Sequence, residues 1–311
     1  MCFLGLVTLA LPCAAQVVGN FTATPIYCKY DPLYDNNSAA NDGLQGAWLT
    51  TYGLPAAGSS TSFVPNCAGY GGANGANPGI FSAVESAVTA KWGPQLDPQT
   101  NITPQGLSAL FYNNGQGAYD HAWVQLSNLT LAPQFTVSAW TKMDCCGIGQ
   151  ITTIPTGYPR IVEIGTYAAG VMLGGNKSPL TPSYGPGGAV TSYGSQYQVV
   201  ISHPDSNNEY GNCQGGNIDG GWHMVTATYD GMDAYLYVDA VKVAGPCPFT
   251  FPSAGMTGLS GRIGAYNNSP ALPYDSLSGF WYGSIDTVLL YGTALNQSKI
   301  QNLYLNGVIT P

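Results

Sequence analysis

Few acidic side chains in this sequence are spaced for acid–base chemistry. Glycoside hydrolysis usually needs two carboxyl groups about 5–10 Å apart, which on one strand face means acids two or four residues apart. The nearest pairs, Asp31/Asp35 and Asp230/Asp233, lie before any expected strand and around an expected turn, and Glu163 has no acidic neighbour. We therefore expect no β-glucan hydrolysis, although acids from different strands remain an open alternative.

Other catalytic and cofactor signatures are missing as well. The sequence contains no G-x-S-x-G motif, which presents the nucleophile of many serine hydrolases. It contains no glycine-rich run between a strand and a helix, the context that binds nucleotides. These observations predict a protein that is not an enzyme and has no cofactor.

Charge is scarce throughout the chain. Charged residues make up 8% of the 311 residues, and the net charge is −8 with only 8 Lys+Arg, whereas an ordinary domain has roughly 25% charged residues. So few cations form no basic patch for nucleic acid or for an anionic membrane surface. A hydrophobic fraction of 45% argues against disorder.

The first residues have the features of a secretory signal. Residues 1–15 are apolar and uncharged, and they end in Cys13-Ala14-Ala15, although a basic start is lacking. We expect a signal peptide over 1–15, cleavage before Gln16 and an extracellular location. No later stretch approaches the ~18 apolar residues of a membrane span.

Six cysteines follow the expected cleavage site, and an even number in a secreted chain predicts three disulfides. We expect Cys28 to pair with Cys67 within the loop-rich segment. The other four would then pair across, Cys145 and Cys146 with Cys213 and Cys247, in either order. A zinc site is the weaker alternative, because the spacing is not C-x-x-C.

Seven Asn-x-Ser/Thr sequons are spread along the chain and predict a glycosylated surface. They lie at Asn20, Asn36, Asn101, Asn128, Asn176, Asn267 and Asn296.

The elements that must position these residues are mostly strands. Residues 16–105 are rich in Gly, Asn and Pro and predict a loop-rich segment that contributes an edge strand near 44–49, with a short helix within 79–92. From about 107, short β-branched and aromatic runs alternate with turn residues. We read 167–221 as a long excursion with one strand, 196–202.

The clearest strands show period-two patterning around turns. Residues 135–140 and 224–229 alternate, Asp230-Gly231 is a hairpin dipeptide, and residues 235–239 return. Residues 285–291 form a further strand, and Asn296 caps a short helix. We expect buried side chains at Phe135, Val137, Trp222, Val225, Val238, Ile285 and Val288.

Three stretches resemble laminin-G-like domains of the concanavalin A-like lectin/glucanase superfamily. They are Phe135-Thr-Val-Ser-Ala-Trp140, then Trp222-His-Met-Val-Thr-Ala-Thr-Tyr-Asp-Gly231 with Tyr235-Leu-Tyr-Val-Asp239, and finally Gly283-Ser-Ile-Asp-Thr-Val-Leu-Leu-Tyr291 with Ile300-Gln-Asn-Leu-Tyr304. The resemblance implies an all-β fold: an antiparallel two-sheet jelly-roll sandwich over 106–306, with long Gly/Pro-rich loops, one short C-terminal helix and a tail at 307–311.

The resemblance also bears on single residues. Glu163 resembles a residue of the family's second strand, but the E-x-D-x-x-E motif of the glucanase branch is missing. His223 occupies a core hairpin position, which implies a structural role. Asp120 is the best candidate for a Ca²⁺ ligand at the sandwich rim. Ala240 replaces the family's usual Gly and predicts a turn of another type.

These features favour a non-catalytic, secreted glycoprotein that acts as an extracellular binding or adhesion module. Its expected partners are glycans or extracellular glycoproteins. A self-assembling structural glycoprotein of a coat, wall or filament is the alternative, and a glycoside hydrolase is the weakest reading.

Overall fold

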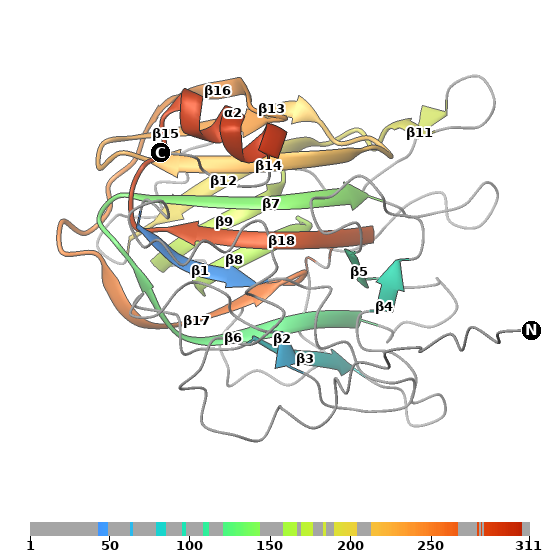
Figure 1. Ribbon diagram of the computed structural model, residues 1–311, viewed down its shortest axis with the longest axis horizontal. Coiled ribbons are helices and arrows are strands. Elements are labelled where there is room, and N and C mark those ends of the chain that lie inside the picture. Colours follow the sequence, from blue (N-terminus) through green and yellow to red (C-terminus); the bar gives the residue numbers. More distant parts are fainter. Residues whose placement is uncertain are drawn as a thin grey trace, which may run out of the picture.

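The computed structural model describes residues 43–48, 63–64, 79–84, 95–97, 108–111, 121–143, 158–166, 169–176, 183–184, 190–203, 213–266, 279, 281 and 283–306. They form two large antiparallel sheets that pack face to face, with one short helix near the C-terminus (Figure 1). The predicted two-sheet sandwich is confirmed.

The first large sheet, called sheet 1 below, has the strand order β16-β15-β14-β7-β18-β5-β4, and β1 also pairs with β18. Its strands are β1 (Leu44–Trp48), β4 (Gln95–Asp97), β5 (Ser108–Phe111), β7 (Phe135–Met143), β14 (Trp222–Tyr229), β15 (Asp233–Val238), β16 (Val241–Pro248) and β18 (Gly283–Tyr291). The three family-like stretches form its central strands.

The second large sheet, sheet 2, has the order β13-β12-β9-β8-β17-β6-β3-β2. Its strands are β2 (Phe63–Val64), β3 (Gly79–Val84), β6 (His121–Leu131), β8 (Arg160–Thr166), β9 (Ala169–Gly175), β12 (Gln196–Ser202), β13 (Cys213–Asn217) and β17 (Met256–Ile263). A separate pair consists of β10 (Ser183–Tyr184) and β11 (Val190–Ser192).

Alternating apolar side chains of both sheets fill the core between them, as period-two patterning requires. Five of the seven side chains expected to be buried are at most 1% exposed: Phe135, Val137, Val225, Ile285 and Val288. Trp222 and Val238 are only half-buried. Trp222 packs against a second apolar cluster that includes Trp140 and Leu303, and Val238 packs against the main core.

That second cluster lies under helix α2 (Gln297–Asn306), which covers part of the outer face of sheet 1 (Figure 1). Asn296 Oδ1 accepts a hydrogen bond from Lys299 N at 3.0 Å, so the expected N-cap is present. Trp140 and Tyr304 stack with ring centroids 5.5 Å apart. Among the described residues, no helix is long and apolar enough to cross a membrane.

Two hairpin turns shape sheet 1. At Asp230-Gly231, Asp230 Oδ1 accepts from Met232 N and Asp233 N, and Gly231 has φ 101°. The next turn corrects the expectation at Ala240: Asp239 and Ala240 have φ 50° and 60°, which is the pattern of a type I′ turn. The turn therefore keeps the geometry usual for Gly, although its second residue is Ala.

Two expected segments differ from the structure. Residues 79–84, the first part of the segment 79–92 expected to hold a short helix, form strand β3, because Ile80, Phe81 and Val84 join the ladder of β6. The remaining residues 85–92 lie outside the described residues. The region 167–221 is not an excursion with one strand, since β9, β12 and β13 are neighbours in sheet 2. Their glycines resemble loop composition, yet Gly174 pairs with Gln198 and Gly215 with Tyr197.

Candidate ligand-binding face on the second sheet

Many of the predicted site residues lie outside the described residues. They are Asp120, Cys28, Cys67, Cys145, Cys146, Asn20, Asn36, Asn101 and Asn267. Among the described residues, no three His, Cys, Asp or Glu side chains gather as metal ligands. Calcium binding at Asp120 therefore stays a prediction.

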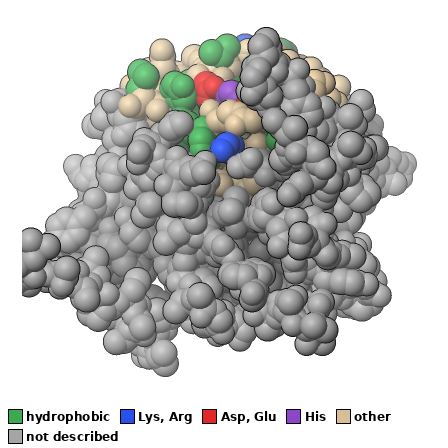
Figure 2. All heavy atoms as spheres, turned by 90° about the vertical axis from the view of Figure 1, so that its right-hand side faces the viewer, with side chains coloured by type: hydrophobic (Ala, Val, Ile, Leu, Met, Phe, Trp, Pro, Cys, Tyr) green, Lys and Arg blue, Asp and Glu red, His purple; other side chains and the backbone are tan. Residues whose placement is uncertain are grey.

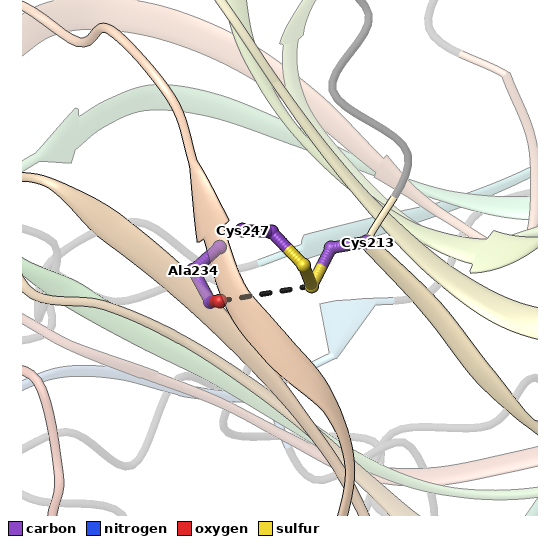
Figure 3. The surroundings of a disulfide bond; sticks show 3 residues. All are labelled: Cys213, Ala234 and Cys247. Carbon is purple, nitrogen blue, oxygen red and sulfur yellow. Dashed lines mark hydrogen bonds between the residues drawn. A yellow bond between two sulfur atoms is a disulfide. The ribbon is translucent and has the colours of Figure 1, made fainter.

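The structure corrects the expected cysteine pairing. Cys213 on β13 bonds to Cys247 on β16, with 5.6 Å between the Cα atoms (Figure 3). Both residues were expected to pair with Cys145 or Cys146. The edge strands of the two sheets come together here, and Cys213 Sγ also lies 3.6 Å from the Ala234 carbonyl oxygen. The sheet topology therefore brings together two cysteines 34 residues apart.

Three sequon asparagines lie in the described part and differ in environment. Asn128 and Asn296 are exposed, whereas Asn176 is half-buried. Asn176 Nδ2 donates to Gln214 Oε1 at 2.6 Å, and its Oδ1 accepts from Gln196 N at 2.8 Å and from Ser195 Oγ at 3.1 Å. Its side chain therefore holds the ends of β9, β12 and β13 together.

His223 links two loops at one end of the sandwich. Its Nδ1 lies 2.7 Å from Asp239 Oδ2, and its Nε2 lies 3.0 Å from Asp219 Oδ1. The hydrogen bond to Asp239 is the main reason that the pKa of His223 rises to about 9; burial opposes the rise and Asp219 adds to it. At neutral pH the imidazolium therefore donates to both carboxylates, which agrees with the structural role implied for it.

Figure 2 looks onto the end of the sandwich where β7 finishes and β14 begins. A histidine and an acidic side chain lie side by side on this face, with a basic side chain and several apolar ones close by. His223, the second residue of β14, lies at this end of the strand.

A different group of polar side chains lies on the outer face of sheet 2. Strand register places Arg262 directly between Gln125 of β6 and Glu163 of β8. The neighbours of Gln125 and Glu163 in their own strands, such as Val124 and Ile164, point into the main core, so these three side chains point outward. Arg160 begins the same strand as Glu163.

We call Gln125, Arg160, Glu163 and Arg262 the arginine cluster. It contains the only two arginines in the chain and one of its three glutamates. Arg160, Glu163 and Arg262 are 5%, 1% and 9% exposed. Charged groups are rarely this buried unless they are paired, so a chain with so few charges has concentrated three of them at one place.

Hydrogen bonds and rings fix the two guanidinium groups. Arg160 Nε donates to Glu163 Oε2 at 3.3 Å, and its Nη1 donates to Tyr158 O at 2.8 Å. Arg262 Nε donates to Gln125 Oε1 and its Nη1 to Tyr266 O, both at 2.9 Å. The Tyr266 ring lies 5.3 Å from the Arg160 guanidinium carbon, so Tyr266 contacts both arginines.

Aromatic side chains border the cluster on both sides. The Trp123 ring lies 5.3 Å from the Arg262 guanidinium carbon, and the Tyr158 ring lies 6.0 Å from that of Arg160. Tyr158 is 52% exposed, whereas Trp123 is 3% exposed and belongs to the main core cluster, so of these two rings Tyr158 is the one open to a ligand. Planar donors beside aromatic rings are the groups that hydrogen-bond to sugar hydroxyls and stack on sugar faces.

Sequence reasoning singled out Glu163 but missed its partners. Arg160 and Arg262 are 102 positions apart, and only the pairing of β17 with β8 brings them together. The sequence feature that could have pointed to them is the rarity of arginine: the chain has only two arginines, and both lie in strands.

Comparison with known proteins identifies the family. A protein-family model described as "Concanavalin A-like lectin/glucanases superfamily" matches residues 116–301. The chain belongs to this superfamily. The matching model is a laminin-G model, so the resemblance carried by the three motifs of sheet 1 is confirmed. No curated protein sequence matches the chain.

Solved structures of the same kind of fold are similar at low sequence identity. A structure of botulinum neurotoxin type C, whose cell entry depends on interaction with two ganglioside molecules, matches with a TM-score of 0.50 and 11% identity over 86% of this chain and 52% of that one. Domain 4 of AbnA, an extracellular GH43 arabinanase from Geobacillus stearothermophilus in complex with arabinotriose, gives 0.47 and 15% over 84% and 98%. Trypanosoma rangeli sialidase gives 0.42 and 16% over 85% and 33%. This superfamily member therefore spans about half of the neurotoxin chain and a third of the sialidase chain, and it has a lectin-like sandwich fold.

Proposed function

We propose that this superfamily member is a secreted, non-catalytic binding module whose ligand is a glycan. The observation that carries the proposal is the arginine cluster on the outer face of sheet 2, with the half-exposed ring of Tyr158 beside it. Rigid polar groups next to an aromatic face are what a sugar site requires. The neurotoxin type C, whose cell entry depends on two ganglioside molecules, is in line with it.

The environment of Glu163 supports a non-catalytic role. Its carboxylate accepts from Arg160 and lies beside Arg262 in the ladder. A glycosidase needs one carboxyl that delivers a proton and a second carboxyl across the scissile bond. Within the arginine cluster, Glu163 is the single carboxylate, so the cluster does not supply the pair of carboxyls that glycoside hydrolysis needs.

A buried ion pair is weak evidence for stability, because desolvation offsets most of its Coulomb energy. A hydrophobic residue at Glu163 would lie opposite Met172 on the neighbouring strand. The presence of a buried ion pair on this face therefore supports a role in recognition.

Glycan-array binding of the purified, full-length protein, together with a native-state size measurement, tests the proposal. We expect a monomer that binds a defined set of glycans. Ordered assembly without glycan binding would instead support the structural-glycoprotein alternative. Incubation with laminarin and xyloglucan tests for catalysis: turnover that Glu163→Gln abolishes would overturn the non-enzymatic role.

A further inference from the structure

We infer that an ordered water molecule binds between the two sheets at the His223 end of the sandwich, where it joins the hydroxyl of Tyr197 to the carboxylates of Asp219 and Asp239. This water site is independent of the proposed glycan-binding function. Three observations carry it: the burial of Tyr197, the lack of a protein partner for its hydroxyl, and the acceptors that surround it.

Tyr197 differs from the other fully buried tyrosines. Tyr193, Tyr197 and Tyr229 are each at most 1% exposed. The hydroxyl of Tyr193 donates to Met143 O at 3.3 Å, and that of Tyr229 donates to Phe249 O at 3.0 Å. The hydroxyl of Tyr197 has no hydrogen-bond partner among the described residues. An unpaired buried hydroxyl is costly, and buried polar groups that lack a protein partner usually bond to ordered water.

Two carboxylates lie near this hydroxyl without accepting from it. The rings of Tyr197 and His223 meet edge to face with centroids 6.3 Å apart, and His223 is hydrogen-bonded to both Asp219 and Asp239. Burial is the main reason that the pKa of Tyr197 is raised well above its ordinary value, and both carboxylates add to the rise. The carboxylates are therefore within electrostatic reach of the hydroxyl but beyond hydrogen-bond distance, which is the arrangement that a water molecule bridges.

Both carboxylates retain acceptor capacity for this water. Asp219 Oδ1 accepts from Gly221 N at 2.6 Å and from His223 Nε2 at 3.0 Å. Asp239 Oδ1 accepts from Met224 N at 2.9 Å, and its Oδ2 accepts from His223 Nδ1 at 2.7 Å. A carboxylate offers about four acceptor sites, so each has sites left. A water that accepts from the tyrosine and donates to both carboxylates makes three hydrogen bonds, which is typical of buried water.

The bridge links elements of both sheets. Tyr197 belongs to β12 of sheet 2, Asp239 lies in the turn between β15 and β16 of sheet 1, and Asp219 lies in the connection from β13 to β14. The water therefore extends the hydrogen bonds of His223 to a hydroxyl in the main core, and the four side chains act as one unit.

The test is Tyr197→Phe, which removes the hydroxyl and keeps the ring. Loss of a hydroxyl that bonds to nothing would leave the urea midpoint of unfolding unchanged or raise it, because a desolvated polar group is removed. With the bridging water, we expect the midpoint to fall. Tyr229→Phe is the matched control, since its buried hydroxyl has a carbonyl partner, and we expect a fall of similar size. An unchanged or higher midpoint for Tyr197→Phe would overturn the water site.

Two further measurements identify the bridge itself. In a double-mutant cycle, Tyr197→Phe and Asp219→Ala should together lower the midpoint by less than the sum of their separate effects, whereas Tyr229→Phe and Asp219→Ala should add. Additive losses for the first pair would overturn the link to Asp219. A high-resolution crystal structure should show a water oxygen about 2.7–2.8 Å from Tyr197 Oη. A protein group in that place, or no density there, would overturn the inference.

Discussion

At the scale of single residues, His223 is the group whose charge depends most clearly on pH. Its pKa in the fold is about 9, above the ordinary value of 6.5, because Asp239 and Asp219 hold the imidazolium. When the pKa of a histidine is higher in the folded than in the unfolded protein, its charge stabilises the fold. This stabilisation is complete at pH values below the pKa of the unfolded state and is lost as the pH rises through the pKa of the folded state. Alkali should therefore loosen this end of the sandwich.

We expect the free energy of unfolding to fall by about 2 kcal/mol between pH 6.5 and 9.5. His223→Gln is the matched variant, because it keeps a polar side chain without the charge, and its stability should change little over this range. Denaturant titrations at several pH values provide the measurement. The pKa values of Tyr197 and Tyr237 are also raised by burial, so the range stops below the ordinary tyrosine pKa. If the wild-type protein and the His223→Gln variant lost the same free energy of unfolding over this pH range, the assignment to His223 would be refuted.

The sequons give a second residue-scale prediction. We expect a glycan on Asn296 and Asn128, which are exposed, and none on Asn176, whose Nδ2 donates to Gln214. The cap at Asn296 uses only Oδ1, which leaves its Nδ2 available. Mass mapping after peptide-N-glycosidase treatment in oxygen-18-labelled water identifies each occupied site, because the released asparagine becomes an aspartate that carries the labelled oxygen. A glycan found on Asn176 would contradict the native hydrogen bonding.

Some residues were readable from sequence and others were not, for physical reasons. The cap at Asn296 depends on local chain geometry, and sequence predicted it correctly. Arg160 and Arg262 depend on strand register between distant segments, which no local pattern encodes. Ala240 misled the prediction because Asp239, which accepts from Met224 N and contacts His223, keeps the turn in the conformation usual for Gly.

At the scale of elements, helix α2 depends on the aromatic side chains beneath it. Trp140 is 7% exposed and stacks on Tyr304. We expect Trp140→Ala to lower the free energy of unfolding by about 3–5 kcal/mol. Trp222 is half-buried at the margin of the same cluster, so we expect Trp222→Ala to lower the free energy of unfolding by roughly half as much. Chemical denaturation of both variants measures the difference, and a larger loss for Trp222→Ala would contradict this ranking.

Sequence predicted the strands of sheet 1 better than those of sheet 2. β7, β14 and β15 alternate strictly and flank a turn dipeptide, so period and turn chemistry agree. β9 and β13 contain several glycines, which lower strand propensity, yet the ladders of β8 and β12 hold them in place. Tertiary pairing overrides local preference there, so the glycine-rich composition of 167–221 does not predict its strands.

At the scale of the whole molecule, the Cys213–Cys247 bond joins the two sheets at their adjacent edges. The strands approach so closely here that a Cβ on Gly215 would overlap the Val243 carbonyl oxygen. The expected pairing with Cys145 and Cys146 rests on elimination, which carries no information about which sheet edges meet.

The bond closes a loop of 34 residues, which restricts the unfolded chain. We expect the double variant Cys213→Ala/Cys247→Ala to be less stable by about 3–4 kcal/mol. Thermal or denaturant unfolding of the variant and the wild-type protein under non-reducing conditions measures this loss. Mass mapping that links either cysteine to Cys145 or Cys146 would refute the pairing.

The pairing of β1 with β18 determines how the sandwich would respond to tension along its chain. Leu44 at the start of β1 faces Tyr291 at the end of β18, so the chain leaves this pair in both directions from the same end. A stretching force would load the backbone hydrogen bonds one at a time, and this pair would open at low force. The 34 residues enclosed by the disulfide could not be stretched while the bond is intact, which shortens the fully extended chain by about 115 Å. A single-molecule stretching record should therefore lengthen by that amount when a reductant is added.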